Sequence, residues 1–309
     1  MAKRISIINF KGGVGKTTLA FNFAAGLARF YDSRVLLVDM DHQSSLSILC
    51  MGATRWEEAV EEGNTIDEVF QNFLGHTSAM PGLEIIVHNP LNKALYASLD
   101  IVPASLHLDD TEIELTASHQ GNAIQSEWNK RTMICQWLEN TGVDDNYDYI
   151  IFDCPPATKI VSQNAIAASH CYIIPVVPEA VMERGAPHLH GMVRTGIDAR
   201  LNALSAMGSP KSMYVADTRL VGLVITRIQT SGGYSGYTDD HTQHLASLRR
   251  QWGDDLIVPF IEQGTGISQA LADGVPVYER HNTQNIGNRG IDVKFQQLTA
   301  ELKLRIDRL

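Results

Sequence analysis

The fold of this 309-residue chain is decided by residues 9 to 18, which read Asn9-Phe10-Lys11-Gly12-Gly13-Val14-Gly15-Lys16-Thr17-Thr18. This glycine-rich run, closed by a lysine and two threonines, is typical of a phosphate-binding loop in the deviant form K-G-G-x-G-K-[ST]-[ST]. The glycines let the backbone turn tightly, so that successive N–H groups point at phosphate oxygens. Lys16 places a positive charge on the β- and γ-phosphates, and the Thr17 hydroxyl is suited to ligate Mg²⁺. We expect the nucleotide-binding residues of the loop to be Gly12, Gly13, Val14, Gly15, Lys16, Thr17 and Thr18.

The residues on either side of the loop support this interpretation. Residues 5–8 are apolar and predict a buried strand, and residues 18–30 place Leu19, Phe23 and Leu27 on one face of a helix. A strand, a glycine loop and a helix in this order put the phosphates at a helix N-terminus, where the helix dipole and free N–H groups favour anions. The alternative is a glycine-rich turn that binds no ligand, but the lysine, the hydroxyls and both flanking elements argue against it.

Composition restricts the class of protein. The chain is 44% hydrophobic and 19% charged, as expected of a globular protein with a sizeable core. Its net charge is −10, so any DNA binding must rest on a local basic patch. The four cysteines form no C-x-x-C pair, which argues for a reducing cytoplasm. No apolar run approaches the roughly 20 residues of a membrane span, and the first strand begins too early for a signal peptide. We expect one domain over residues 1–309, with a less patterned insertion around residues 52–98.

Acidic residues follow two further apolar runs. Residues 34–39 end in Asp39, with Asp41 just beyond, and residues 149–153 end in Asp153. Doubly wound sheets bind ligands at the carboxyl ends of their strands, so these acids are expected beside the loop. Asp39 and Asp41 alternate along an extended backbone and point to opposite sides, which indicates different roles. Asp153 occupies the place of a Walker B acid, which polarises a magnesium-bound water. Helix capping or a solvated turn is the alternative for Asp39 and Asp41.

Lys11 is a second lysine that an ordinary phosphate-binding loop lacks. Two ammonium groups this close repel each other unless an anion lies between them. With Lys11 the loop resembles that of the ParA/MinD superfamily of deviant Walker A ATPases, and the chain is most similar to the ParA/Soj-type partition ATPases. The resemblance implies an α/β P-loop NTPase fold, doubly wound, with a mostly parallel sheet and helices on both faces. It also implies that Lys11 reaches the partner's ATP in a nucleotide-sandwich dimer; a solvated loop lysine is the alternative.

The resemblance assigns roles to the remaining site residues. Residues 39–43 resemble the D-x-D-P-Q switch of the family, which implies that Asp41 positions or activates the attacking water and that Asp39 supports the magnesium shell. The segment departs from the family pattern at His42, where the family usually has proline, so the flexibility of the switch is an open point. Residues 147–156 match the family's Y-D-Y-I-I-I-D-C-P-P segment, which places Asp153 at the magnesium site together with Thr17. Thr226 and Arg227 end a later strand and are expected to contact the nucleotide base.

The resemblance also implies a function. ATP and Mg²⁺ would assemble a homodimer that binds DNA non-specifically, and a ParB-like or other adaptor would stimulate hydrolysis. The output would be the positioning of a plasmid, a chromosome or other cargo on the nucleoid. The candidate DNA contacts are the basic residues of the C-terminal third, Arg249, Arg250, Arg280, Arg289 and Lys294.

Three alternatives remain open for the function and its surface. The arginines could be isolated surface residues. A MinD-like membrane reading would need an amphipathic tail, but residues 302–309 lack aromatic anchors. A metal-cluster carrier would need paired cysteines, which this sequence does not place at suitable spacing.

The rest of the chain predicts a regular succession of elements. We expect strands at residues 83–87, 172–177, 221–227 and 256–261, and helices at residues 106–115, 161–168, from 179 onward, 238–252 and 292–309. Residues 99–105 resemble a strand of the family and its exit. Glu112 and Glu114 are interpreted as surface acids, and residues 229–237 as a flexible loop. Residues 267–271 resemble a turn of the family.

Overall fold

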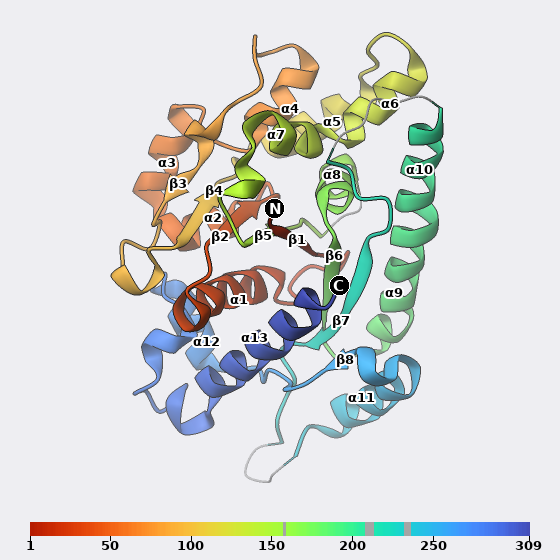
Figure 1. The fold of residues 1–309 in the computed structure, drawn as a ribbon. Helices are drawn as coiled ribbons and strands as arrows, with labels where there is room; N and C mark the ends of the chain where they lie inside the picture. The colour runs from red at the N-terminus through yellow and green to blue at the C-terminus, as the bar shows by residue number, and fades with distance from the viewer. Residues whose placement is uncertain (157–158, 208–212, 232–235) are drawn as a thin grey trace.

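A computed structural model describes residues 1–156, 159–207, 213–231 and 236–309. Within these residues the chain forms an eight-stranded sheet with the order β3-β4-β2-β5-β1-β6-β7-β8 (Figure 1). All neighbouring strands pair in parallel except β3, which runs antiparallel to β4 at one edge. The fold is the doubly wound, mostly parallel architecture that the sequence predicts.

The strands are short, and except for the edge strand β3 they are largely buried. Their bounds are β1 Lys3–Ile7, β2 Val35–Asp39, β3 Val87–His88, β4 Leu99–Val102, β5 Tyr149–Asp153, β6 Cys171–Val176, β7 Arg219–Ile225 and β8 Leu256–Ile257. In β2 every side chain is buried, because helices cover both faces of a parallel sheet. Leu36 and Val38 face one core and Val35 and Leu37 the other.

Helices divide between the two faces. On the face of Val35 and Leu37 lie α1 Lys16–Tyr31, α2 Ser45–Met51, α3 Ala53–Glu61, α12 Thr265–Ala272 and α13 Ile291–Asp307. On the opposite face lie α4 Asp67–Leu74, α5 Leu108–Ala117, α6 Ala123–Arg131, α7 Met133–Thr141, α8 Ile160–Ala168, α9 Ala180–Gly191, α10 Ala199–Ala206 and α11 Asp239–Trp252. A π-helical segment, Met192–Asp198, joins α9 to α10, so the long helix predicted from residue 179 is present. Among the described residues, no helix combines the length and the apolar character needed to cross a membrane.

Some predicted elements are wrong, each for a local reason. Leu83–Ile85 is a 3₁₀ turn and not a strand, because the Glu84 carboxylate accepts the Gly82 N–H at 2.7 Å and closes a turn. β8 ends at Ile257, before Pro259, which has no N–H to donate to a neighbouring strand. The predicted turn at residues 267–271 lies inside the helix α12. Part of the predicted flexible loop, residues 232–235, lies outside the described residues.

Glu112 is also not the surface acid that the sequence suggests. Its side chain is buried, and Oε1 accepts the backbone N–H of Val161 in the first turn of α8 at 3.1 Å. Glu112 therefore ties α5 to the N-terminus of α8, where a negative charge is stabilised by the helix dipole. Glu114, two residues on, is exposed as predicted.

Candidate functional site

The phosphate-binding loop joins β1 to α1 at the carboxyl edge of the sheet. Gly13 and Gly15 have φ angles of 73° and 80°, a left-handed conformation that side chains with a Cβ rarely adopt. The helix α1 begins directly at Lys16, so its free N–H groups face the loop. Burial lowers the pKa of Lys16, while the carboxylates of Asp153 and Asp41 act in the opposite direction. This lysine is held in a partly desolvated site, where its attraction for phosphate is strengthened.

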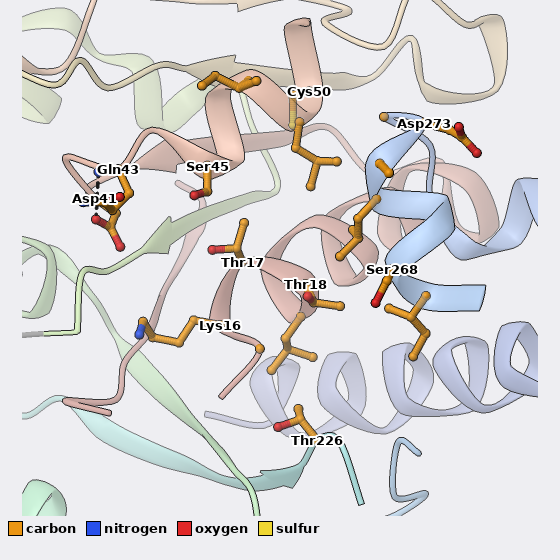
Figure 2. A pocket seen from close by; sticks show the side chains of 18 of the residues that line it. Lys16, Thr17, Thr18, Asp41, Gln43, Ser45, Cys50, Thr226, Ser268 and Asp273 are labelled. Atoms are coloured by element: carbon orange, nitrogen blue, oxygen red, sulfur yellow. Dashed lines mark hydrogen bonds between the residues drawn. The ribbon is translucent and has the colours of Figure 1, made fainter. Parts of the chain in front are cut away.

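A cleft of about 1300 Å³ opens above the loop (Figure 2). Lys16, Thr17 and Thr18 rise from its floor at the start of α1, and Asp41 and Gln43 stand on the side that follows β2. On the other sides the cleft is lined by Thr226, after β7, and by Ser268, on α12. A cleft of this size, floored by a helix N-terminus, has room for a nucleoside triphosphate.

Asp39 and Asp153 lie side by side beneath the cleft, as register partners at the ends of β2 and β5. Asp39 is fully buried, and its Oδ2 accepts the backbone N–H and the hydroxyl of Ser47 at 2.9 and 2.7 Å. Its Oδ1 accepts the Asp41 N–H at 3.1 Å. Burial raises the pKa of Asp39 to about 7, against these hydrogen bonds, which lower it. Both of its oxygens are therefore used to hold the segment between β2 and α2.

Asp153 differs from Asp39 because neither of its buried carboxylate oxygens has a hydrogen-bond partner within the described residues. Burial raises the pKa of Asp153 well above its ordinary value, and the Asp39 carboxylate raises it further. The Thr17 hydroxyl and the Lys16 ammonium lower it, so both groups lie near this carboxyl. An unpartnered carboxylate beside a threonine hydroxyl is a donor set that suits Mg²⁺ and its bound waters. The residues present thus fit the metal, and Thr17 and Asp153 are the two whose oxygens would hold it.

Asp41 stands at the mouth of the cleft, with 14% of its side chain exposed. Its Oδ1 accepts the Gln43 N–H at 3.0 Å, which folds the segment into a turn. The His42 imidazole Nδ1 lies 3.6 Å from the same oxygen, and its Nε2 lies 2.7 Å from the Gln43 amide nitrogen. The structure therefore separates the two acids: Asp39 faces inward and Asp41 faces the cleft, as their alternation in the sequence predicts.

Thr226 and Arg227 both contact the backbone of the loop. The Thr226 hydroxyl donates to the Val14 carbonyl at 2.6 Å, and an Arg227 guanidinium nitrogen donates to the Gly13 carbonyl at 2.5 Å. Both residues also line the cleft. In this structure the two side chains therefore hold two carbonyl groups of the loop in place.

Comparisons with known proteins agree with this geometry. The sequence model of the family described as AAA domain matches residues 2–205. The sporulation initiation inhibitor protein Soj of Bacillus subtilis is 28% identical over 277 residues, which cover 90% of each chain. The chromosome-partitioning ATPase Soj of Treponema pallidum is 27% identical over 300 residues, which cover 97% of this chain and 98% of that protein. The chain belongs to the ParA/MinD family of ATPases.

Solved structures of other proteins share the fold of this ParA/MinD chain. An ATP complex of McdA from Cyanothece superposes with a TM-score of 0.68 at 18% identity and covers 98% of this chain and 96% of that one. A putative plasmid partition protein of Borrelia burgdorferi, bound to AMPPNP, gives a TM-score of 0.67 at 20% identity and covers 99% of each chain. The family and the fold class predicted from the sequence are therefore confirmed.

Lys11, the second lysine of the family's loop, does not point into the cleft in this single subunit. Its Nζ donates to Oε2 of Glu179, the residue that precedes α9. Its backbone N–H is held by the Asn9 side-chain oxygen at 2.9 Å, and the Asn9 amide donates to the Pro175 carbonyl at 2.7 Å. The predicted role of Lys11 at a partner's ATP stays a prediction.

The predicted DNA contacts of the ParA/MinD chain do not form one patch. Arg249 and Arg250 are exposed on α11, which packs on one face of the sheet. Arg289 and Lys294 lie on the other side, where both bind Glu262, at 3.1 and 2.5 Å. The remaining candidate, Arg280, forms an ion pair with Asp273. Arg249 and Arg250 are thus the candidates without such an acidic partner among the described residues, although Arg249 also stacks on Phe260 at 5.3 Å.

Sequence reasoning missed several residues that shape the site. Ser47 donates to Asp39 and also accepts the Ala104 N–H at 3.0 Å, so it connects β2, α2 and the end of β4. Asn9 and Glu179 together fix the position of Lys11. Glu179 follows a buried strand, as Asp39 and Asp153 end theirs, and this shared position is the signal that could have found it. No comparable signal marks Ser47, which lies inside a helix.

Proposed function

We propose that this chain is a ParA-type ATPase that dimerises on ATP, binds DNA non-specifically and positions or segregates cargo through an adaptor-stimulated cycle of hydrolysis. The observation that supports it best is the cleft, in which Lys16, Thr17 and Asp41 converge above the buried Asp153. These are the groups that phosphoryl transfer to water requires. Relatives named as partition ATPases, among them the Caulobacter vibrioides chromosome partitioning protein ParA, support the same class of function.

The chemistry follows from the position of each group. The loop N–H groups and the Lys16 ammonium hold the β- and γ-phosphates and stabilise negative charge that shifts between them. Thr17 and Asp153 would hold Mg²⁺, which would supply further positive charge beside the phosphates. The Asp41 carboxylate faces the cleft and can accept a hydrogen bond from the attacking water, which orients it towards the γ-phosphate. Asp39 supports this arrangement from below by fixing the backbone of Asp41.

The exposed arginines favour DNA, rather than a membrane, as the surface to which the protein binds. Arg249 and Arg250 project from the last turn of α11, where no described acid forms an ion pair with them. Contacts of this kind go to phosphates and carry no sequence information, in keeping with non-specific binding.

Two alternative readings lose support. In α13, the helix that would serve as a membrane tail, Leu302 and Ile306 are buried against the sheet, so its apolar stripe is used in the fold. The four cysteines, Cys50, Cys135, Cys154 and Cys171, are also buried, which does not suit a metal cluster shared at a surface.

The substitution Asp41→Ala tests the proposal. The variant should still bind ATP and Mg²⁺, because Lys16 and the loop are unchanged, but it should hydrolyse ATP at least about a hundredfold more slowly. It should therefore accumulate as a dimer with ATP, which light scattering measures directly. A variant that remains monomeric with saturating ATP, or that hydrolyses ATP at the wild-type rate, would contradict the proposed cycle.

A further inference from the structure

The contact between Lys11 and Glu179 is the starting point. Both side chains belong to one subunit, and they are 31% and 40% exposed. Lys11 begins from a backbone that Asn9 fixes, and its ammonium is directed to the start of α9. It does not contribute to the lining of the cleft that Lys16 and Thr17 enter, as far as the described residues show. The ammonium that the proposed function needs at another subunit's phosphate is thus engaged within its own chain.

The neighbouring residue strengthens this attachment. The Phe10 ring packs on α9 where Gly185 has no side chain, and a Cβ at Gly185 would lie only 2.6 Å from the ring atom Cζ. The ring also meets His188 edge to face, with 6.4 Å between centroids. Two consecutive loop residues, Phe10 and Lys11, are therefore docked on one helix, by an apolar contact and by an ion pair.

We infer that Glu179 is a positioning residue that holds Lys11 within its own subunit and so restrains formation of the ATP dimer. This inference rests on the proposed function, because it assumes that Lys11 acts on the nucleotide of a second copy. An ammonium bound to Glu179 must leave it to reach a phosphate across an interface. Both subunits of a symmetric dimer must make this change, so the ion pair opens twice for each dimer formed.

The size of the effect follows from the exposure of the pair. A half-exposed ion pair favours its closed form by about threefold. Because two pairs open in each dimer, removing both should lower the dimer dissociation constant by about tenfold. The affinity of the monomer for nucleotide should not change, since Lys16 and the loop N–H groups are untouched.

The test compares two glutamates at the start of α9, Glu179 just before the helix and Glu183 in its first turn. Glu179→Gln removes the charge that holds Lys11 and keeps the size of the side chain. Glu183→Gln is the matched control, because Glu183 makes a similar ion pair one turn further on, with His244 at 2.8 Å, and does not contact Lys11. Sedimentation velocity with a non-hydrolysable ATP analogue and Mg²⁺ gives the dimer dissociation constant of each protein. Thermal unfolding shows whether both variants fold as the wild type does.

We expect Glu179→Gln to dimerise about tenfold more tightly than the wild type and Glu183→Gln to match the wild type. The inference is overturned if Glu179→Gln dimerises no more tightly than the wild type, or if Glu183→Gln shows the same gain. A wild type that stays monomeric with the analogue at every concentration would instead remove the proposed dimer, and the restraint with it.

Discussion

Replacing Asp153 by asparagine should stabilise the ligand-free protein while it impairs magnesium binding. The Asp153 carboxylate is 1% exposed, and neither oxygen has a hydrogen-bond partner among the described residues. A buried charge destabilises the folded protein by several kcal/mol unless it is compensated, and the adjacent Asp39 adds repulsion that the Lys16 ammonium only partly offsets. An asparagine amide is equally unpartnered but carries no charge, so at a pH where the carboxylate would ionise we expect Asp153→Asn to raise the free energy of unfolding by about 2 kcal/mol. In a chain of this length that corresponds to a thermal midpoint about 3 °C higher.

The two raised pKa values also predict how the free energy of unfolding changes with pH. Burial raises the pKa of Asp153 well above 3.8, and it raises that of Asp39 to about 7. Above about pH 4 the folded protein therefore holds protons that the unfolded chain has released, so the free energy of unfolding falls as the pH rises towards about 7. Asp153→Asn removes one of these two groups. The variant should lose stability less steeply than the wild type over the same interval.

Calorimetric unfolding between pH 5 and 8, with and without Mg²⁺ and ATP, measures both effects. Asp148→Asn is a suitable control, because Asp148 is exposed and backbone hydrogen bonding from Arg34 lowers its pKa. That change should alter the midpoint by less than about 1 °C, in the opposite direction. The reasoning fails if Asp153→Asn lowers the midpoint in metal-free buffer, or if Mg²⁺ and ATP stabilise the variant as much as the wild type.

Two further predictions address the nucleotide and the DNA. Lys16→Ala removes the buried ammonium at the floor of the cleft and should weaken ATP binding at least about a hundredfold; retained micromolar affinity in calorimetry would contradict the assigned loop. Arg249→Glu combined with Arg250→Glu should weaken binding to duplex DNA and flatten its dependence on salt, whereas Arg280→Glu, at an arginine already paired with Asp273, should change both much less. A gel shift that is unchanged by the α11 double substitution would place the DNA site elsewhere.

The sequence predicts the centre of this fold well because the constraints there are local. Gly13 and Gly15 adopt positive φ angles, and Lys16 begins a helix. The positions of these three residues in the sequence are therefore enough to predict the conformation of the loop. The same holds for Asp39 and Asp153, which end apolar runs and therefore lie together at the edge of a parallel sheet.

Other features depend on contacts between distant segments and have no local signature. Glu112 reads as a surface acid, yet it is buried because α8 brings the Val161 N–H to it across 49 residues. The predicted DNA contacts look like one basic region in sequence, but α11 and α13 pack on opposite faces of the sheet and separate them. The ion pair between Arg280 and Asp273 likewise forms only in the folded chain, so the sequence alone does not reveal it.

The bonds from Thr226 and Arg227 to the phosphate-binding loop have a consequence for biosynthesis. The loop is among the first segments to leave the ribosome, but the hydroxyl that braces Val14 comes 212 residues later. A nascent chain that ends at residue 205, where the match to the family model stops, already carries the whole glycine loop and still lacks both contacts to it. We therefore expect a chain of this length to hold the loop less firmly, and to bind ATP more weakly, than the 309-residue protein does.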